Sequence, residues 1–395
     1  MQFAVALSKT IETESAARTA AEDIRAQLNA ASIDLACVFF SAHHAAGADR
    51  LAHVLTAVLR PRLLIGCSGE GVITGAEELE TAPALTVWAA VLPDVNLHSL
   101  RSSFSPTHDQ FHLSGWPEPG GVEEASFLLL ADPFTVPVQD ILRILEERYP
   151  GTKVIGGLAG GGQEAGMNRL VLNDQVLDGG LVGVRLSGAV DIRPIISQGC
   201  RLIGDRFVVT KAERNLIHEL GGMPALERLQ AVFESLTEGD RRRVNRALHL
   251  GIVIDEHRNR FERGDFLIRN LLGADRTTGA VAIGDVVQEG QTVQFHLRDA
   301  ESATEDLRSL LATDRAAHRH PPHGVLLFSC CGRGRGLFGR PNHDVAVTTE
   351  CLGPIPLAGF FAQGEIGPIG NRNFLHGYTA CLALFAERNS KQFHG

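Results

Sequence analysis

Apolar positions along the chain follow two spacings, which together predict a strand–helix–strand unit. Over residues 12–30, apolar side chains recur every four positions, which is typical of one buried helix face. The continuous apolar run 35–40 predicts a buried strand, and an amphipathic helix follows it and stops at Pro61. A strand at 63–65 then runs directly into the glycine-rich segment 66–71.

The same order occurs again further along the chain. Strands at 126–130 and 153–155 flank a helix and lead into the glycine-rich segment 156–162, which lies 90 residues after the first such segment. A third copy is predicted from the strand 325–328 and the glycine-rich segment 359–367. Self-similarity of this kind predicts an internal duplication, with chance resemblance between generic α/β units as the alternative.

Other parts of the chain carry antiparallel signals. Three pairs of short strands, each separated by a turn, look like hairpins: 86–91 with 96–100, 183–188 with 190–194, and 280–283 with 292–295. Helices are expected at 223–237 and 301–313. The pattern predicts a mixed α/β (α+β) protein with partly antiparallel sheets. The break at Gly221-Gly222 predicts two domains, 1–220 and 221–395.

Charge and cysteine usage exclude several kinds of partner. A formal net charge of −9 argues against nucleic acid, because phosphate contacts need a basic face. The main basic cluster is bracketed by the acidic residues Glu238, Asp240 and Asp255 and is interpreted as a solvated helix face: Arg241, Arg242, Arg243 and Arg246. No apolar stretch or leader-like N-terminus predicts a membrane segment. Seven cysteines without disulfide spacing are typical of a reducing, cytoplasmic compartment.

Five sequence blocks, taken in order, resemble the FIST (F-box and intracellular signal transduction) family. They are 66–73, with its Gly-Cys-Ser start, 197–211, 268–275, 328–334, and the block 356–367, Pro-Leu-Ala-Gly-Phe-Phe-Ala-Gln-Gly-Glu-Ile-Gly. The resemblance implies an N-terminal and a C-terminal FIST domain that act as a sensory module for small ligands, amino acids among them. It further implies a stand-alone sensor without a cofactor, which signals through an unidentified partner protein. The sequence leaves the oligomeric state open.

The candidate ligand-binding residues lie in or beside the glycine-rich segments: Gly66, Cys67, Ser68, Glu70, Cys330, Arg333, Gly364 and Glu365. Backbone amides exposed by glycines can hold an anion, and the Arg333 guanidinium can clamp a carboxylate through two parallel hydrogen bonds. Glu70 or Glu365 would receive an ammonium group, so a small zwitterion is expected in a pocket between the two halves. Alternatively, the glycines only permit close packing, and Arg333 ties down loop carbonyls or pairs with Glu365.

Two other functions compete with the sensor. A cysteine-dependent enzyme of the acyl-transfer type would use Cys67 or Cys330 as nucleophile. Its base would come from His43, His44 or His376. A buried apolar role is the alternative for each cysteine. A protein-interaction scaffold would instead show an exposed apolar patch.

Metal and nucleotide sites are not expected. His318, His320 and His323 surround Pro321-Pro322, and the prolines favour a surface loop over a metal site. The chain has no Cys-x-x-Cys pair for structural zinc and no phosphate loop that ends in Gly-Lys-Ser/Thr.

Overall fold

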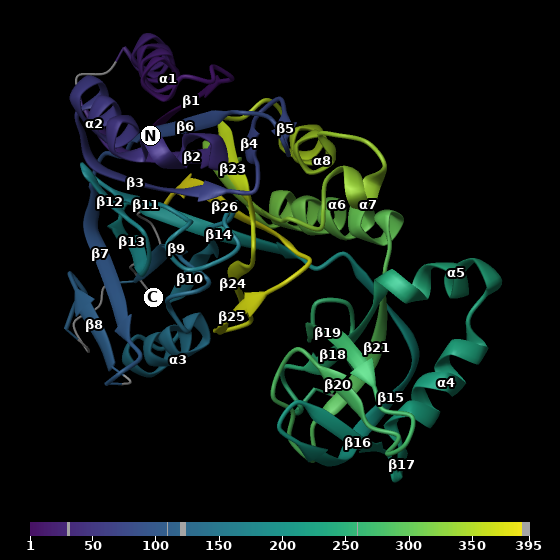
Figure 1. The fold of residues 1–395 in the computed structure, drawn as a ribbon. Helices are drawn as coiled ribbons and strands as arrows, with labels where there is room; N and C mark the ends of the chain where they lie inside the picture. Colours follow the sequence, from purple (N-terminus) through teal and green to yellow (C-terminus); the bar gives the residue numbers. More distant parts are fainter. Residues whose placement is uncertain (30–31, 109, 119–123, 259, 389–395) are drawn as a thin grey trace, which may run out of the picture. The chain divides into compact units, whose positions relative to one another are not determined.

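The chain forms two compact units in a computed structural model (Figure 1). Unit 1 comprises Met1–Ile196 and Leu307–Gly395, and unit 2 comprises Ser197–Asp306. The structure describes residues 1–29, 32–108, 110–118, 124–258 and 260–388.

Unit 1 contains three copies of one arrangement, in which a strand, a helix and a parallel strand are followed by a hairpin and a returning strand. The first copy consists of β1 (Gln2–Ser8), α1 (Thr13–Leu28), β2 (Ile33–Ser41), η1 (Ala42–Gly47), α2 (Ala48–Leu59), β3 (Pro61–Gly69), β4 (Val72–Thr74), β5 (Glu78–Leu79) and β6 (Leu85–Val91). The second consists of β7 (Val95–Ser105), β8 (Gln110–Ser114), β9 (Ala125–Ala131), α3 (Val138–Arg148), β10 (Lys153–Leu158), β11 (Leu170–Leu172), β12 (Gln175–Leu177) and β13 (Leu181–Gly188).

The third copy is interrupted by unit 2, which follows its first strand. It consists of β14 (Val190–Ser197), the end of α6 (Ala300–Ala317), β22 (Gly324–Cys330), α7 (Arg335–Phe338), α8 (His343–Leu352), β23 (Leu357–Ala362), β24 (Glu365–Ile369), β25 (Arg372–His376) and β26 (Ala380–Glu387). The predicted triplication is therefore confirmed, and α6 begins in unit 2 and ends in unit 1.

Each copy builds the centre of one sheet and completes the sheet of another copy. The pairs β2/β3, β9/β10 and β22/β23 are parallel, and β6, β13 and β26 return antiparallel beside them. The hairpin β4–β5 of the first copy adds to β23, β11–β12 of the second adds to β3, and β24–β25 of the third adds to β10. The exchange closes in a cycle, so each copy depends on a neighbour for its sheet.

One glycine in each copy marks the closest packing of the parallel strands. Gly66, Gly156 and Gly359 occupy equivalent positions in β3, β10 and β23. A Cβ atom there would lie 2.2, 1.8 and 1.7 Å, respectively, from the carbonyl oxygen of the facing residue. The facing residues are, in the same order, Val38, Leu129 and Leu327. No side chain larger than hydrogen fits at these positions.

A ring of backbone hydrogen bonds joins the three copies just beyond these glycines. The residue four positions after each glycine donates its N–H to the residue two positions after the glycine of another copy. These bonds run from Gly160 to Ser68 (3.0 Å), from Gln363 to Leu158 (3.2 Å) and from Glu70 to Phe361 (3.1 Å). We call these six residues the hub. Its closed order gives unit 1 a pseudo-threefold symmetry.

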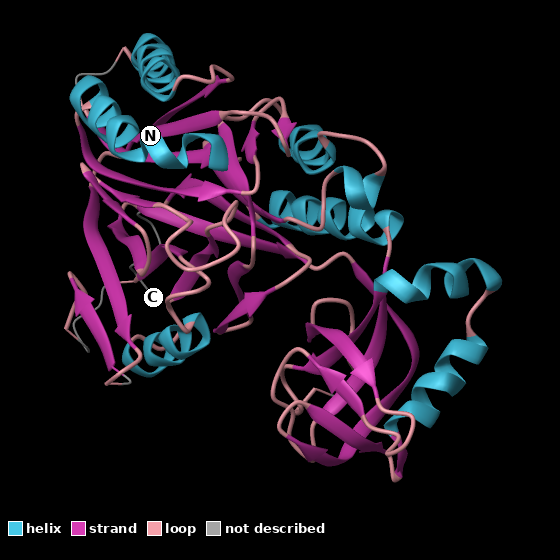
Figure 2. Cartoon of the chain, in the orientation of Figure 1, coloured by secondary structure: helices cyan, strands magenta, loops and turns pink. Residues whose placement is uncertain are grey.

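Both faces of the three sheets are buried. In β2, Leu35, Cys37 and Phe39 join an inner core shared by all three copies, while Val38 and Phe40 pack against α1 and α2. Corresponding outer cores lie under α3 and under α6 with α8. Helices thus cover the outer faces of unit 1 (Figure 2), and burial on both faces explains why the strands read as continuous apolar runs.

Unit 2 is a small antiparallel barrel with two helices. Its strands pair in the order β15-β21-β18-β19-β20-β16, and pairing between β16 and β15 closes the ring. The elements are β15 (Cys200–Glu213), β16 (Leu216–Leu220), β17 (Met223–Pro224), α4 (Ala225–Ser235), α5 (Glu238–Ala247), β18 (Leu248–Val253), β19 (Phe266–Ala274), β20 (Val281–Ile283) and β21 (Thr292–Arg298). An apolar core around Val293, Phe295 and Leu297 fills the barrel.

The three predicted hairpins are wrong, although their strands exist. β6 and β7, β13 and β14, and β20 and β21 follow one another along the chain, but no pair is hydrogen-bonded. The first two turns are the boundaries between copies, where the chain leaves one sheet for the next. The third turn leads β21 away to pair with β15 and β18 across the barrel. In the sequence, two successive strands with a connecting turn look the same whether or not the strands pair with each other.

The compact units follow a different division from the predicted domains 1–220 and 221–395. The break at Gly221-Gly222 lies inside unit 2, in the turn between β16 and β17. Both glycines have positive φ angles (57° and 72°), which explains the interruption in the sequence pattern as a local turn. The predicted boundary between domains 1–220 and 221–395 stays a prediction.

Two further expectations from the sequence concern the basic cluster at 241–246 and membrane-spanning segments. Arg241 and Arg242 lie exposed on α5, and Arg242 pairs with Glu238 one turn away. The side chains of Arg243 and Arg246 lie outside the described part of the chain. Within that part, no helix combines the length and the apolar character that crossing a bilayer requires.

Replacing Gly359 by alanine is expected to lower the free energy of unfolding by about 3 kcal/mol, because the added methyl group meets a backbone oxygen that cannot move aside. Gly336→Ala is the matched control, since its Cβ meets nothing within 4 Å. Denaturant unfolding of both variants checks the prediction. Equal stabilities would contradict the packing role of Gly359.

Candidate functional site

The carboxyl ends of the three parallel strand pairs meet at the hub. In open α/β sheets, ligands usually bind beyond this edge. The three glycine-rich segments come together there, and all three belong to unit 1 and not to two facing domains. Glu70 is exposed there, Cys330 ends β22, and Glu365 begins β24.

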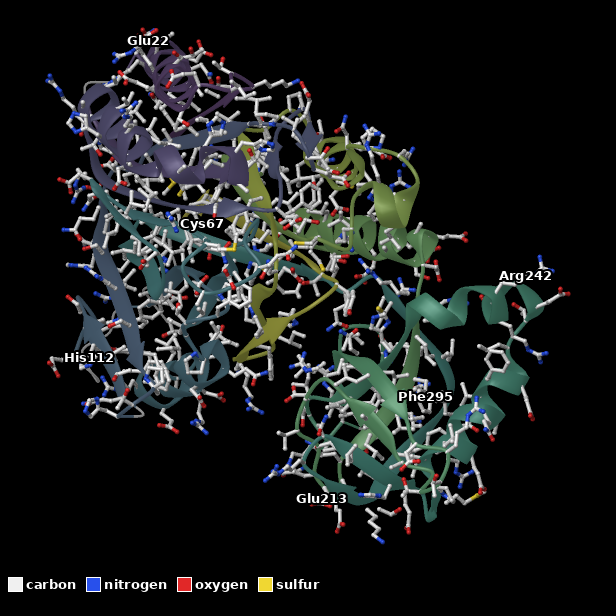
Figure 3. All side chains as sticks on the ribbon, in the orientation of Figure 1. Glu22, Cys67, His112, Glu213, Arg242 and Phe295 are labelled. Atoms are coloured by element: carbon white, nitrogen blue, oxygen red, sulfur yellow. The ribbon has the colours of Figure 1, made fainter. Side chains whose placement is uncertain are left out.

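Three of the candidate residues lie inside a strand and not in a loop. Gly66, Cys67 and Ser68 belong to β3, where Gly66 faces Val38 and Cys67 is fully buried (Figure 3). The Ser68 hydroxyl accepts a hydrogen bond from the backbone N–H of Arg169 (3.1 Å). The sequence analysis placed Gly66 in a glycine-rich loop, but in the structure it allows β3 to approach β2 closely.

Backbone amides around the hub are already engaged. The N–H groups of Glu70, Gly160 and Gln363 form the hub ring, and that of Gly162 donates to Asn168 Oδ1 (2.9 Å). The Leu158 N–H donates to the carbonyl of Gly364 (2.8 Å). These amides do not form the anion cradle that the glycines suggested.

Arg333 clamps a carboxylate of the protein. Its Nε and Nη2 atoms donate to Asp344 Oδ2 and Oδ1, both at 2.7 Å, which forms the two-bond fork expected for a ligand. The Arg333 guanidinium also lies 5.2 Å from the ring centre of Phe338. Through this fork, Arg333 fixes the start of α8.

Glu365 is also committed to the fold. It is fully buried, and its Oε2 accepts hydrogen bonds from the backbone N–H (3.1 Å) and the hydroxyl (2.5 Å) of Thr379. These bonds tie β24 to the segment that enters β26. Of the predicted acidic residues, Glu70 is the one on the surface.

A second carboxylate lies against the Arg333–Asp344 pair. Glu78, in the exchanged hairpin of the first copy, accepts a hydrogen bond from the Val345 N–H (2.9 Å) at the start of α8. Burial and the nearby Asp344 carboxylate raise the pKa of Glu78 to about 7 from its ordinary value of 4.5. Burial also acts to raise the pKa of Asp344, but the Arg333 guanidinium outweighs it and holds that pKa well below its usual range.

A polar pocket of 340 Å³ lies elsewhere in unit 1, between β14 and the end of α6. Its lining comprises Arg193, Asp314, Arg315, His318, Arg319, His320, Pro321, Pro322 and Leu352. Arg193 and Asp314 are only 5% and 7% exposed. The basic residues outnumber the single acidic one in a chain whose formal net charge is −9.

The buried pair in this pocket is incompletely hydrogen-bonded. Arg193 Nη1 donates to the His320 carbonyl (3.3 Å), and Nη2 lies 3.3 Å from Asp314 Oδ2. Among the described residues, Arg193 Nε and Nη2 and Asp314 Oδ2 have no hydrogen-bond partner. Burial raises the pKa of Asp314. Asp344 therefore fills the fork of Arg333, whereas in the described part of the chain Arg193 Nε has no acceptor and Nη2 contacts Asp314 Oδ2 only as an ion pair.

The sequence reading missed Arg193 and Asp314. Strand periodicity was the available signal, because Arg193 shares a face of β14 with Ile195, which belongs to a buried core. The segment around His318 and His320 was expected to be a surface loop, and both residues are exposed. That segment also forms one wall of the pocket, which local sequence did not indicate.

Comparison with known proteins decides the family. The FIST N domain model matches residues 34–223, and the FIST C domain model matches residues 225–368. The chain belongs to the FIST family. FIST domains are associated with signal transduction, which gives this FIST protein a signalling role.

Mycobacterial proteins resemble this FIST protein along its whole length. An uncharacterized protein of Mycobacterium tuberculosis is 43% identical over 389 residues, which cover 98% of this chain and 100% of the relative. An uncharacterized protein of Mycobacterium bovis is 43% identical over 392 residues, which cover 98% of this chain and 99% of the relative.

Four thiols of this FIST protein, among them the candidate nucleophile Cys67, are poorly suited to nucleophilic attack. Burial raises the pKa values of Cys67, Cys37 and Cys381, and it also raises that of Cys331, although Cys331 is exposed. A raised pKa keeps the thiol protonated and therefore unreactive near neutral pH.

The candidate bases already have partners of their own. His43 Nδ1 is hydrogen-bonded to the Ser41 hydroxyl (3.3 Å), and His44 Nδ1 to the Thr13 hydroxyl (3.1 Å). The third candidate base, His376, is hydrogen-bonded through Nε2 to the carbonyl of Gly367 (2.9 Å).

Glu78→Gln is expected to remove a pH dependence of stability. Because the folded pKa of Glu78 is raised, the unfolded chain loses this proton first, and stability falls as pH rises from about 4.5 to 7. Relative to the wild type, the variant should gain on the order of 2–3 kcal/mol between pH 5 and pH 8. Glu77→Gln, on the same hairpin but half-exposed, is the control. Parallel pH profiles of wild type and Glu78→Gln would refute the assignment.

Alkylation of the native protein at pH 7 is expected to modify Cys331 slowly and to spare Cys67, Cys37 and Cys381 until the chain unfolds. Peptide mass mapping over time checks this order, with urea-unfolded protein as the reference. Rapid labelling of native Cys67 would instead restore the thiol-enzyme hypothesis.

Proposed function

We propose that this FIST protein is a sensory protein that binds a small carboxylate, with an α-amino acid as the best-fitting class. The supporting observation is the Arg193–Asp314 pair, a buried pair of opposite charges with unsatisfied hydrogen-bonding atoms beside a 340 Å³ pocket. Buried polar groups in native proteins are almost always satisfied, so unsatisfied ones beside a pocket favour a missing ligand.

An amino acid supplies the groups that this pair lacks. Its carboxylate offers two acceptors for the Nε–H and Nη2–H of Arg193, in the geometry that Arg333 already makes with Asp344. Its ammonium group offers donors for Asp314 Oδ2. Because these atoms are shielded from solvent, entry requires the exposed rim residues His318 and Arg319 to move. Arg319 and Arg315 on the rim add attraction for the carboxylate.

Binding would be reported through the end of α6, which carries Asp314. A ligand shifts an equilibrium only through its different affinity for two states, and fixing Asp314 and His318 would favour one arrangement of this helix end. The unidentified signalling partner protein would respond to that change. Glu70 and Cys330 at the hub stay predicted ligand contacts, and the raised thiol pKa values do not favour the enzyme alternative.

Thermal unfolding in the presence of amino acids is expected to identify the ligand class. A ligand at about 100 times its Kd stabilises the folded state by about 2.7 kcal/mol, which raises Tm by roughly 5 °C. The matching α-keto acid lacks the ammonium group and the matching amine lacks the carboxylate, so each should give a much smaller shift.

Two variants locate the site. Arg193→Lys keeps the positive charge but loses the fork, and Arg319→Gln changes only the exposed rim, so both should reduce the shift. Arg340→Gln, an exposed arginine outside the pocket lining, is the control. A shift lost in Glu70→Gln but kept in Arg193→Lys would move the ligand to the hub. No shift with any amino acid would remove the proposal.

A further inference from the structure

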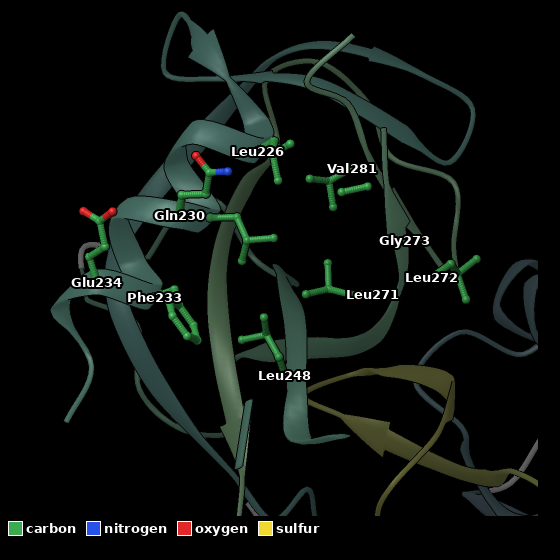
Figure 4. A pocket seen from close by; sticks show the side chains of 11 residues that line it. Leu226, Gln230, Phe233, Glu234, Leu248, Leu271, Leu272, Gly273 and Val281 are labelled. Carbon is green, nitrogen blue, oxygen red and sulfur yellow. The ribbon is translucent and has the colours of Figure 1, made fainter. Parts of the chain in front are cut away.

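Unit 2 contains a large pocket with a mostly apolar lining, in contrast to the polar pocket at Arg193 in unit 1. Its volume is 720 Å³, within the range of small-molecule sites. The lining comprises Leu226, Leu229, Gln230, Phe233, Glu234, Leu248, Leu271, Leu272, Gly273, Ala274 and Val281. Leucine and valine side chains from α4 and from the barrel strands point into one space (Figure 4).

The pocket exists because α4 uses two faces. Ala225 and Val232 lie seven residues apart on one face, and both are buried against the barrel core. Leu226, Leu229 and Phe233 lie on a second face, which lines the pocket. Leu226 and Leu229 also pack against the barrel core, so the pocket lies beside the docked part of the helix.

The opposite wall comes from three neighbouring strands. Leu248 begins β18, Leu271 belongs to β19 and Val281 to β20, and these strands pair in this order. At the rim, Phe233 remains 40% and Leu272 61% exposed. Large apolar side chains exposed around a cavity of this size favour an apolar occupant.

One end of the pocket is polar and acidic. Gln230 and Glu234 lie on α4, and Glu234 is the one ionisable residue in the lining. Arg241, outside the lining, is held by the backbone carbonyls of Phe233 and Glu234. The Arg241 guanidinium also lies 5.7 Å from the Phe233 ring centre, so both charges border this end, and the Glu234 carboxylate is the group there that would pair with a cationic head group.

We propose that unit 2 binds an apolar amine, with the alkyl or aryl body between α4 and the barrel wall and the protonated amino group at Glu234. This site is independent of the proposed amino-acid site, because all of its residues belong to unit 2 and Arg193 and Asp314 belong to unit 1. The FIST protein would then respond to two chemically different ligands.

The test uses the full chain and displacement of a neutral apolar fluorophore by octylamine, octanol and octanoate at pH 7, each below its micelle concentration. The three probes share one body and differ only in the head group. The expected order of affinity is amine, then alcohol, then carboxylate. Failure of all three to displace the fluorophore, or preference for octanoate, would overturn the proposal.

Variants assign the body and the head group separately. Phe233→Ala should weaken all three ligands about tenfold through lost apolar contact. Glu234→Gln should cost the amine about threefold while leaving the alcohol unchanged. Phe233 and Glu234 are at the rim, so neither change threatens folding.

The control is Val286→Ser, which alters a 64% exposed apolar residue of unit 2 outside the pocket and should change nothing. Arg193→Lys should also leave amine binding intact, which separates this proposal from the amino-acid site. Equal losses in Val286→Ser and Phe233→Ala would show non-specific surface binding and overturn the assignment.

Discussion

Three backbone contacts made possible by glycine hold unit 1 together. Gly66, Gly156 and Gly359 let each parallel strand pair approach so closely that a methyl group would collide with a carbonyl oxygen. This approach brings the strand ends together, and the hub ring forms where they meet. The exchanged hairpins then complete the sheets and enclose the shared inner core. A cyclic arrangement of this kind closes on itself, as in a symmetric oligomer, but within one chain.

The same fold uses buried charge in two different ways. Arg333 and Asp344 satisfy each other through two hydrogen bonds, and Glu78 joins them to secure an exchanged hairpin against α8. Arg193 and Asp314 are equally buried, yet key atoms of both lack partners. Burying an ion pair is costly unless its hydrogen bonds are complete. The first pair therefore serves the fold, while the incomplete hydrogen bonding of the second is the observation on which the proposed binding site rests.

The different pockets of the two units follow from how each unit is built. Unit 1 is a layered body whose strands are buried on both faces, so its pocket lies at the end of a helix beside polar side chains. Unit 2 is a small barrel with α4 packed beside it, and apolar side chains of the helix and the barrel strands line its pocket. The polar pocket and the apolar pocket thus lie in different units, and α6 is an element that belongs to both units.

Sequence by itself determined the strands, the helices and the three related glycine-rich segments, because strand burial, helix periodicity and glycine placement are local signals. It did not reveal which strands pair, since the turn between β6 and β7 predicted a hairpin although the two strands belong to different sheets. Nor did it separate Arg333 from Arg193, because an arginine becomes a structural clamp or a binding group according to whether a carboxylate from another element completes its fork. Only the tertiary structure decides this, since the partners lie on different elements and burial makes each missing hydrogen bond costly.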